Sequence, residues 1–165
     1  MAKLLRSWPE ISRLQPDKHM TLVTDIKTEI KTALDTLVSG GVIKEVQHDD
    51  FRVGIFDRDY AKFPVAILTT PSIEGEYLTN RQNTRIHTFE IIILMRGEDV
   101  GSPADVENLM ETILDKFDNN PTLTAKADGG VEPSITSPEV VIARSKSFIT
   151  FSVIVKAKAV KDLTF

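Results

Sequence analysis

Residues 86–96, near the middle of the chain, read IHTFEIIILMR, and this segment determines how the other elements must pack. In its second half, from Phe89 to Met95, apolar side chains occupy both alternating sets of positions. A strand with one face in water alternates apolar and polar residues, whereas a strand buried on both faces is almost continuously apolar. We therefore expect a long central strand, covered on one face by helices and on the other by another element or a second subunit.

Two amphipathic helices are predicted, one before and one after this strand. Apolar residues recur at helical spacing over residues 21–38, and Gly40-Gly41 can end that helix in a left-handed conformation. Ser102-Pro103-Ala104-Asp105 combines a capping serine, a first-turn proline and an acidic residue, and an apolar stripe follows over Val106–Phe117. Each helix has one apolar face that must be buried.

Segments rich in β-branched and aromatic residues predict the other strands. Val42–Gln47, Phe51–Phe56 and Phe63–Thr69 precede the central strand, and Ile149–Ala159 alternates apolar and polar residues in a long final strand. Pro71–Asn83 is rich in polar residues and is predicted to be an exposed loop. Because two helices on one face of a mainly antiparallel sheet would bury both apolar stripes, the sequence predicts a single-domain α+β fold.

The first residues are expected to form an arm ahead of this domain. Residues 1–17 carry scattered apolar side chains, Trp8 among them, but prolines interrupt the stretch before a long helix can form. The arm could pack on its own domain or on a neighbouring subunit. Residues 18–165 are expected to form the one α+β domain.

Composition limits the classes of function. The 165 residues include 24 acidic and 20 basic side chains, which give a net charge of -4, and no cysteine. The chain therefore lacks the basic character of a nucleic-acid-binding domain, and it cannot form disulfides or thiolate sites. It has no apolar run long enough to span a bilayer and no secretory signal at its start, so we expect no membrane contact and synthesis in the cytoplasm.

No segment has the spacing of a catalytic or cofactor-binding motif. His19, His48 and His87 fall in different predicted elements and lack the spacing of metal ligands. The glycine pairs lie where a helix end and a turn require them, and no phosphate-binding loop is present. We therefore predict that the protein is not an enzyme and that it binds no cofactor or metal.

Charged side chains indicate two possible contact surfaces. Lys156 and Lys158 on the final strand could face an acidic neighbour, or could protect a strand edge against unwanted pairing. Acidic residues on the second predicted helix could be a solvated face or a mating surface for a basic neighbour. These acidic residues are Glu107, Glu111, Asp115 and Asp118.

The loop predicted over Pro71–Asn83 is the main candidate for a subunit contact. It is long for a connection between two strands, and unusually long loops tend to be functional or disordered. It also mixes apolar anchors with charges, which suits an interface better than a passive turn. Its candidate contact residues are Glu74, Glu76, Tyr77, Leu78 and Arg81, to which Trp8, Lys156 and Lys158 are added.

The order of these elements resembles that of the siphophage tail terminator, or tail completion, proteins. The resemblance covers about residues 20–160. It rests on the segments Phe63–Ile67, Glu74–Leu78 and Phe89–Met95, followed by the capped helix Val106–Phe117. The longer N-terminal arm departs from the family pattern.

The resemblance implies a non-enzymatic structural protein of the virion of a long-tailed phage, located at the tail neck and assembled in the host cytoplasm. Such a protein forms a homohexameric ring that caps the tail tube, ends its polymerisation and forms part of the head-tail interface. Its partners would be other copies of itself, the tail tube protein and a head-completion or connector protein, with DNA only as cargo passing through the ring. The residues proposed above would then form the subunit or tail-tube interface.

Two alternatives stay open at this point. The first is another neck or tail component, such as a head-completion protein or a tail tube protein. The second, more remote, is an enzyme or a small-molecule binding module, which a deep polar pocket with converging titratable groups would favour.

Overall fold

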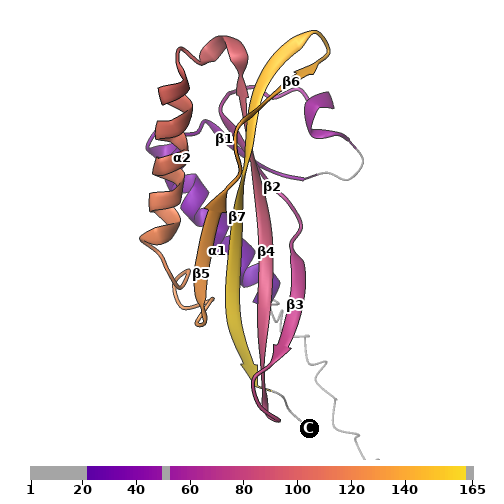
Figure 1. Cartoon of the computed structure of the whole chain (residues 1–165), viewed down its shortest axis with the longest axis vertical. Helices are drawn as coiled ribbons and strands as arrows, with labels where there is room; N and C mark the ends of the chain where they lie inside the picture. Colours follow the sequence, from indigo (N-terminus) through magenta and orange to yellow (C-terminus); the bar gives the residue numbers. More distant parts are fainter. Residues whose placement is uncertain (1–21, 50–52, 163–165) are drawn as a thin grey trace, which may run out of the picture.

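The computed structural model describes residues 22–49 and 53–162, which form two helices and one seven-stranded sheet (Figure 1). The α+β fold expected from the sequence is therefore confirmed. In chain order the helices and strands are α1 (Leu22–Ser39), β1 (Glu45–His48), β2 (Val65–Leu68), β3 (Ser72–Tyr77), β4 (Gln82–Arg96), α2 (Pro103–Asp118), β5 (Gly130–Ile135), β6 (Glu139–Ala143) and β7 (Lys146–Asp162).

Strands β4 and β7 form the spine of the sheet. They pair antiparallel over the whole length of β4, from Gln82 opposite Asp162 to Arg96 opposite Phe148. The main strand order is β1-β2-β4-β7-β5, with β3 pairing with β4 and β6 pairing with β7. Only the β1–β2 pair is parallel among these pairings. In Figure 1 the β6–β7 hairpin lies at one end of the long axis and the β3–β4 hairpin at the other.

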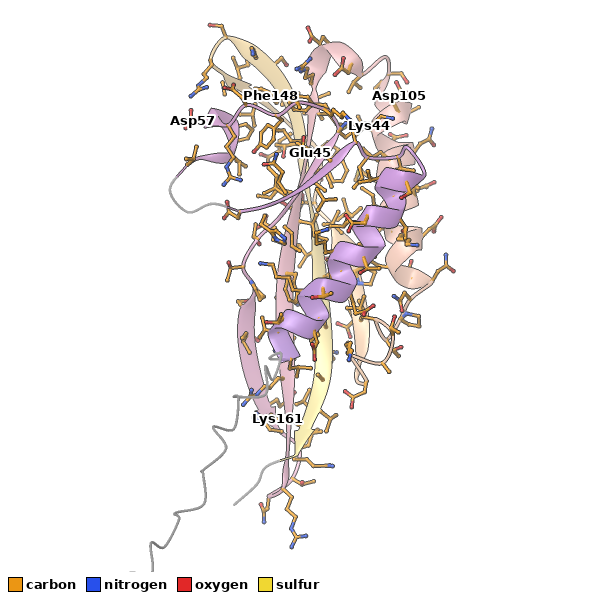
Figure 2. All side chains as sticks on the ribbon, turned by 180° about the vertical axis from the view of Figure 1, so that it is seen from behind. Lys44, Glu45, Asp57, Asp105, Phe148 and Lys161 are labelled. Carbon is orange, nitrogen blue, oxygen red and sulfur yellow. The ribbon has the colours of Figure 1, made fainter. Side chains whose placement is uncertain are left out.

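Both helices pack on the same face of the sheet. Asp105 helps to define the start of α2, because its carboxylate accepts hydrogen bonds from the backbone N–H of Ser102 at 2.8 Å and of Gly101 at 3.0 Å. Seen from behind in Figure 2, α1 crosses the sheet diagonally and α2 lies beside it. The largest fully buried side chains of this core are Ile26, Ile30, Leu34, Ile43, Leu68, Phe89, Ile91, Ile93, Ile113 and Phe117.

Among the described residues, the opposite face of the sheet is covered at one end only. There the segment between β1 and β2 folds over the strands, and Tyr60 packs with Val65, Ile67, Leu94 and Phe148. The apolar second half of β4 is therefore buried on both faces, as the sequence predicts, and the second cover is an element of the same chain. The rest of this face, which we call the helix-free face, carries the outward side chains of β3, β4, β5 and β7.

Two predictions of local structure are wrong. The strand predicted over Phe51–Phe56 is replaced, in its described part, by a 3-10 helix over Ile55–Asp57. The exposed loop predicted over Pro71–Asn83 is mostly strand, because β3 pairs with β4 from Ser72 opposite Thr88 to Tyr77 opposite Asn83. This strand is polar because it lies at a sheet edge. The predicted arm, residues 1–17, lies outside the described residues.

Candidate subunit interface

The described residues do not assemble a metal site. Within residues 22–49 and 53–162, no group of three or more His, Asp or Glu side chains could hold a metal ion. His87 is 1% exposed, and its Nδ1 has no hydrogen-bond partner. Burial lowers the pKa of His87, and the nearby charge of Arg85 lowers it further, against a hydrogen bond to the backbone of Ala157. This ring is therefore neutral at pH 7 and packs as part of the core.

No helix in the described part of the chain is long and apolar enough to cross a membrane.

The structure places most of the predicted contact residues at one end of the molecule. Glu74 and Glu76 lie exposed on β3, while Leu78 and Arg81 lie exposed in the turn that leads to β4. Tyr77 ends β3 as the backbone partner of Asn83. These residues therefore form the end of a hairpin, not a loop. Trp8 lies outside the described residues.

The two predicted lysines lie on the same helix-free face as the acidic residues of β3. Glu74 is opposite Ile86 of β4, and Ile86 is opposite Lys158 of β7. The acidic and basic rows are thus separated by two strand spacings, about 10 Å. The structure brings these predicted residues onto one surface.

Only one of these lysines is available to a partner. Lys158 is in an ion pair with Glu132 of β5, with 2.5 Å between Nζ and Oε1. Hydrogen bonding and charge from Lys158 lower the pKa of the Glu132 carboxyl. Lys156 is exposed and has no ion pair within the described residues.

The most exposed large apolar side chains among the described residues were not predicted as contact residues. Val140 and Ile142 of β6 are 69% and 77% exposed. They alternate along the strand, and Val140 is opposite Ile149 of β7, so both lie on the helix side of the sheet. We call this surface the β6 apolar face. The tight turn that carries it, Arg144-Ser145, has positive φ angles of 49° and 61°.

An apolar groove of about 560 Å³ adjoins the β6 apolar face, between β6 and the first turns of α2. Val106 and Met110 of α2 line it together with Pro103, and Glu107 and Glu139 are its two charged lining residues. A monomeric protein rarely exposes a continuous apolar patch without a use for it, and such patches mark contact sites. The apolar run over residues 140–142 was visible in the sequence, but its edge position was not.

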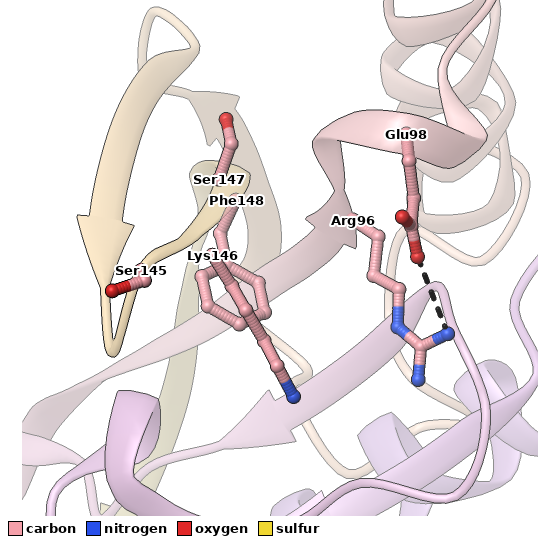
Figure 3. A pocket seen from close by; sticks show the side chains of 6 residues that line it. All are labelled: Arg96, Glu98, Ser145, Lys146, Ser147 and Phe148. Atoms are coloured by element: carbon pink, nitrogen blue, oxygen red, sulfur yellow. Dashed lines mark ion pairs between the residues drawn. The ribbon is translucent and has the colours of Figure 1, made fainter.

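The turn end of the β6–β7 hairpin is held against the body of the domain. A pocket of about 340 Å³ lies there, lined by the side chains drawn in Figure 3. Its Arg96 is 3.6 Å from the Glu98 carboxylate and lies 4.6 Å from the ring centroid of Phe63. Phe148 packs tilted against Phe63, with 6.0 Å and 6.1 Å to the rings of Phe56 and Phe63 respectively. These contacts hold the hairpin in place, so the β6 apolar face is presented in a defined orientation.

Comparison with known proteins identifies a fold of this kind in a virion. No protein-family model matches the sequence, and no curated protein matches it. In structure the chain is similar to a chain of the virion of a native gene transfer agent (GTA) particle, with a TM-score of 0.51 and 7% sequence identity. The similarity covers 87% of this chain and 99% of that chain. At this identity the likeness is one of fold.

Proposed function

We propose that this chain is a structural virion protein of a long-tailed phage, and specifically a tail terminator. In this role it forms a hexameric ring that caps the tail tube, ends tube polymerisation and forms part of the head-tail interface. The observation that carries the proposal is the likeness in fold to a virion chain that is matched over almost its whole length. The finer assignment as a tail terminator is supported by the order of the elements along the sequence, which resembles that family.

One exposed surface supports the proposed formation of a ring. A closed ring uses a head-to-tail interface, in which two different surfaces of the subunit meet. The β6 apolar face and the adjoining groove offer one such surface, with Val140 and Ile142 largely in water in the single chain. In this proposal the function lies in subunit contacts, and the protein has no catalytic role.

The β3–β4 hairpin is proposed to contact the tail tube. Leu78 and Arg81 lie exposed in its turn, at the opposite end of the long axis from the β6–β7 hairpin. A ring has two end faces that bind different partners, so one end of each subunit can face the tube and the other the head.

Assembly of tail tubes tests this proposal. Tube protein is polymerised with and without the purified chain, and the length of the tubes is measured by electron microscopy. A terminator shortens the tubes in proportion to the amount added, and native mass spectrometry shows a six-subunit species. If the chain itself polymerises into tubes, it is a tube protein. If it stays monomeric and does not change tube length, the proposal is wrong.

A further inference from the structure

The face of α2 that is turned away from the core is strongly acidic. Its four carboxylates are all exposed, and within residues 22–49 and 53–162 none of them forms an ion pair. We call this surface the acidic ridge. It consists of Glu107, Glu111, Asp115 and Asp118.

A groove of opposite charge lies beside α1. It has a volume of about 400 Å³, and among residues 22–49 and 53–162 no carboxylate lines it. Lys31 is held by Asp35 at 2.6 Å, whereas Lys27 has no ion pair among the described residues. Partial burial lowers the pKa of His48, and the charges of Lys27 and Lys31 lower it further, against the opposite effect of Asp35. We call this surface the basic groove, lined by Thr24, Lys27, Thr28, Lys31 and His48.

The acidic ridge and the basic groove lie at opposite edges of the sheet and at the same level along it. His48 ends β1 and, through Leu68 of β2, is in register with Ile91 of β4. On the other side α2 packs beside β5, and Ile135 of β5 is in register with the same Ile91 through Val153 of β7. A rotation about an axis along the strands keeps this level, so it can bring one surface against the other.

We propose that the acidic ridge of one copy docks against the basic groove of the next copy, and that this contact closes the ring. The inference rests on the proposed function and names the subunit interface that it requires. Opposite charges on the two surfaces give the contact its register and exclude docking of like surfaces. Because the two surfaces differ, the contact is head-to-tail, as ring closure demands.

The apolar groove extends this interface. Glu107 belongs to the acidic ridge and also lines the apolar groove, whose far wall includes Val140. The acidic ridge, the apolar groove and the β6 apolar face therefore form one continuous surface.

Charge reversal gives a direct test. The ridge variant carries Glu111→Lys and Asp115→Lys, and the groove variant carries Lys27→Glu and Lys31→Glu. Each variant alone places like charges across every contact, so the concentration needed for ring formation should rise by roughly tenfold or more. Mixed in equal amounts, the two variants can alternate around a six-membered ring, and every contact then pairs opposite charges. Native mass spectrometry should show rings in the mixture with three copies of each.

Controls separate loss of docking from loss of folding. Thermal unfolding of each variant is compared with that of the wild type. The single change Lys27→Glu keeps the Lys31–Asp35 pair and puts the new carboxylate four residues before Lys31, where it suits the helix. Lys126→Glu reverses an exposed charge outside both surfaces and should leave ring formation unchanged.

The outcomes distinguish this inference from the proposed function. If the wild type forms rings and both folded variants form them equally well, the proposed docking surfaces are wrong. The same holds if the variants form no rings and mixing does not restore them. In both cases the proposed function as a ring is still supported. If the wild type forms no ring even on tubes, both proposals fail. Rings that form only from the mixed variants and the wild type support the docking as stated.

Discussion

Replacing the apolar side chains of β6 should weaken the proposed ring formation without unfolding the protein. The perturbation is the double change Val140→Thr and Ile142→Thr, which keeps β-branched side chains on the strand. The two residues are 69% and 77% exposed in the single chain, so folding buries only a small part of each. The free energy of unfolding should therefore change by less than about 0.5 kcal/mol, as for ordinary surface substitutions.

The effect on assembly follows from the same exposures. Full burial of a valine or isoleucine side chain contributes about 1.5–3 kcal/mol. With about 70% of each surface still in water, docking can gain roughly 1–2 kcal/mol from each residue, or about 2–4 kcal/mol from the pair. Because every 1.4 kcal/mol is tenfold in an equilibrium constant, the dissociation constant of one contact should rise by up to roughly 30- to 700-fold.

Sedimentation velocity over a series of concentrations measures this change, with thermal unfolding as the test of folding. Val53→Thr is the matched control, because Val53 is also exposed, at 41%, but lies outside the β6 apolar face. A double variant that assembles at the same concentrations as the wild type would refute the role of β6.

Three other predictions concern the core, the buried histidine and the hairpin turn. Phe117→Ala, at a fully buried position of α2, should lower the free energy of unfolding in urea by about 3–5 kcal/mol. The folded-state pKa of His87 is lowered, so the unfolded chain binds more protons below pH 6.5, and stability should fall as the pH drops through that value. Urea midpoints at pH 7.5 and 5.5 should therefore differ more in the wild type than in His87→Gln. Leu78→Ser with Arg81→Glu should leave ring formation unchanged and weaken capping in the tube-length assay, since both side chains are exposed in the turn.

The elements that the sequence predicts well are those whose local pattern agrees with their environment. α2 has its capping residues and its apolar stripe in the expected order, and β4 carries the continuous apolar run of a strand buried on both faces. Both appear within a few residues of the predicted bounds.

The elements that the sequence predicts poorly depend on long-range pairing. β3 reads SIEGEY, and its polar residues and glycine indicate a loop. It is a strand because β4 extends far enough to pair with it, which no local pattern shows. The segment over Ile55–Asp57 has residues typical of a strand. Ile55 and Phe56 instead belong to the segment that covers the sheet, where they pack against the cluster of Tyr60, Val65, Ile67, Leu94 and Phe148.

The same limit applies to the candidate interface. The sequence identified Glu74, Glu76, Lys156 and Lys158 as charged residues, but only the register of β3, β4 and β7 places them on one face. Lys158 forms its ion pair with Glu132 of another strand, and no sequence pattern near Lys158 indicates this partner. The β6 apolar face was missed because an apolar strand at an uncovered edge has the same sequence pattern as a buried one.

Electron microscopy of capped tubes tests whether this chain ends a tail tube as a six-membered ring, as proposed. Tubes assembled in the presence of the chain should carry one additional ring with six-fold symmetry at one end, and the fold of the domain should fit each of its six subunits. Tubes with the chain distributed along their length, or bare ends beside free monomer, would contradict the account.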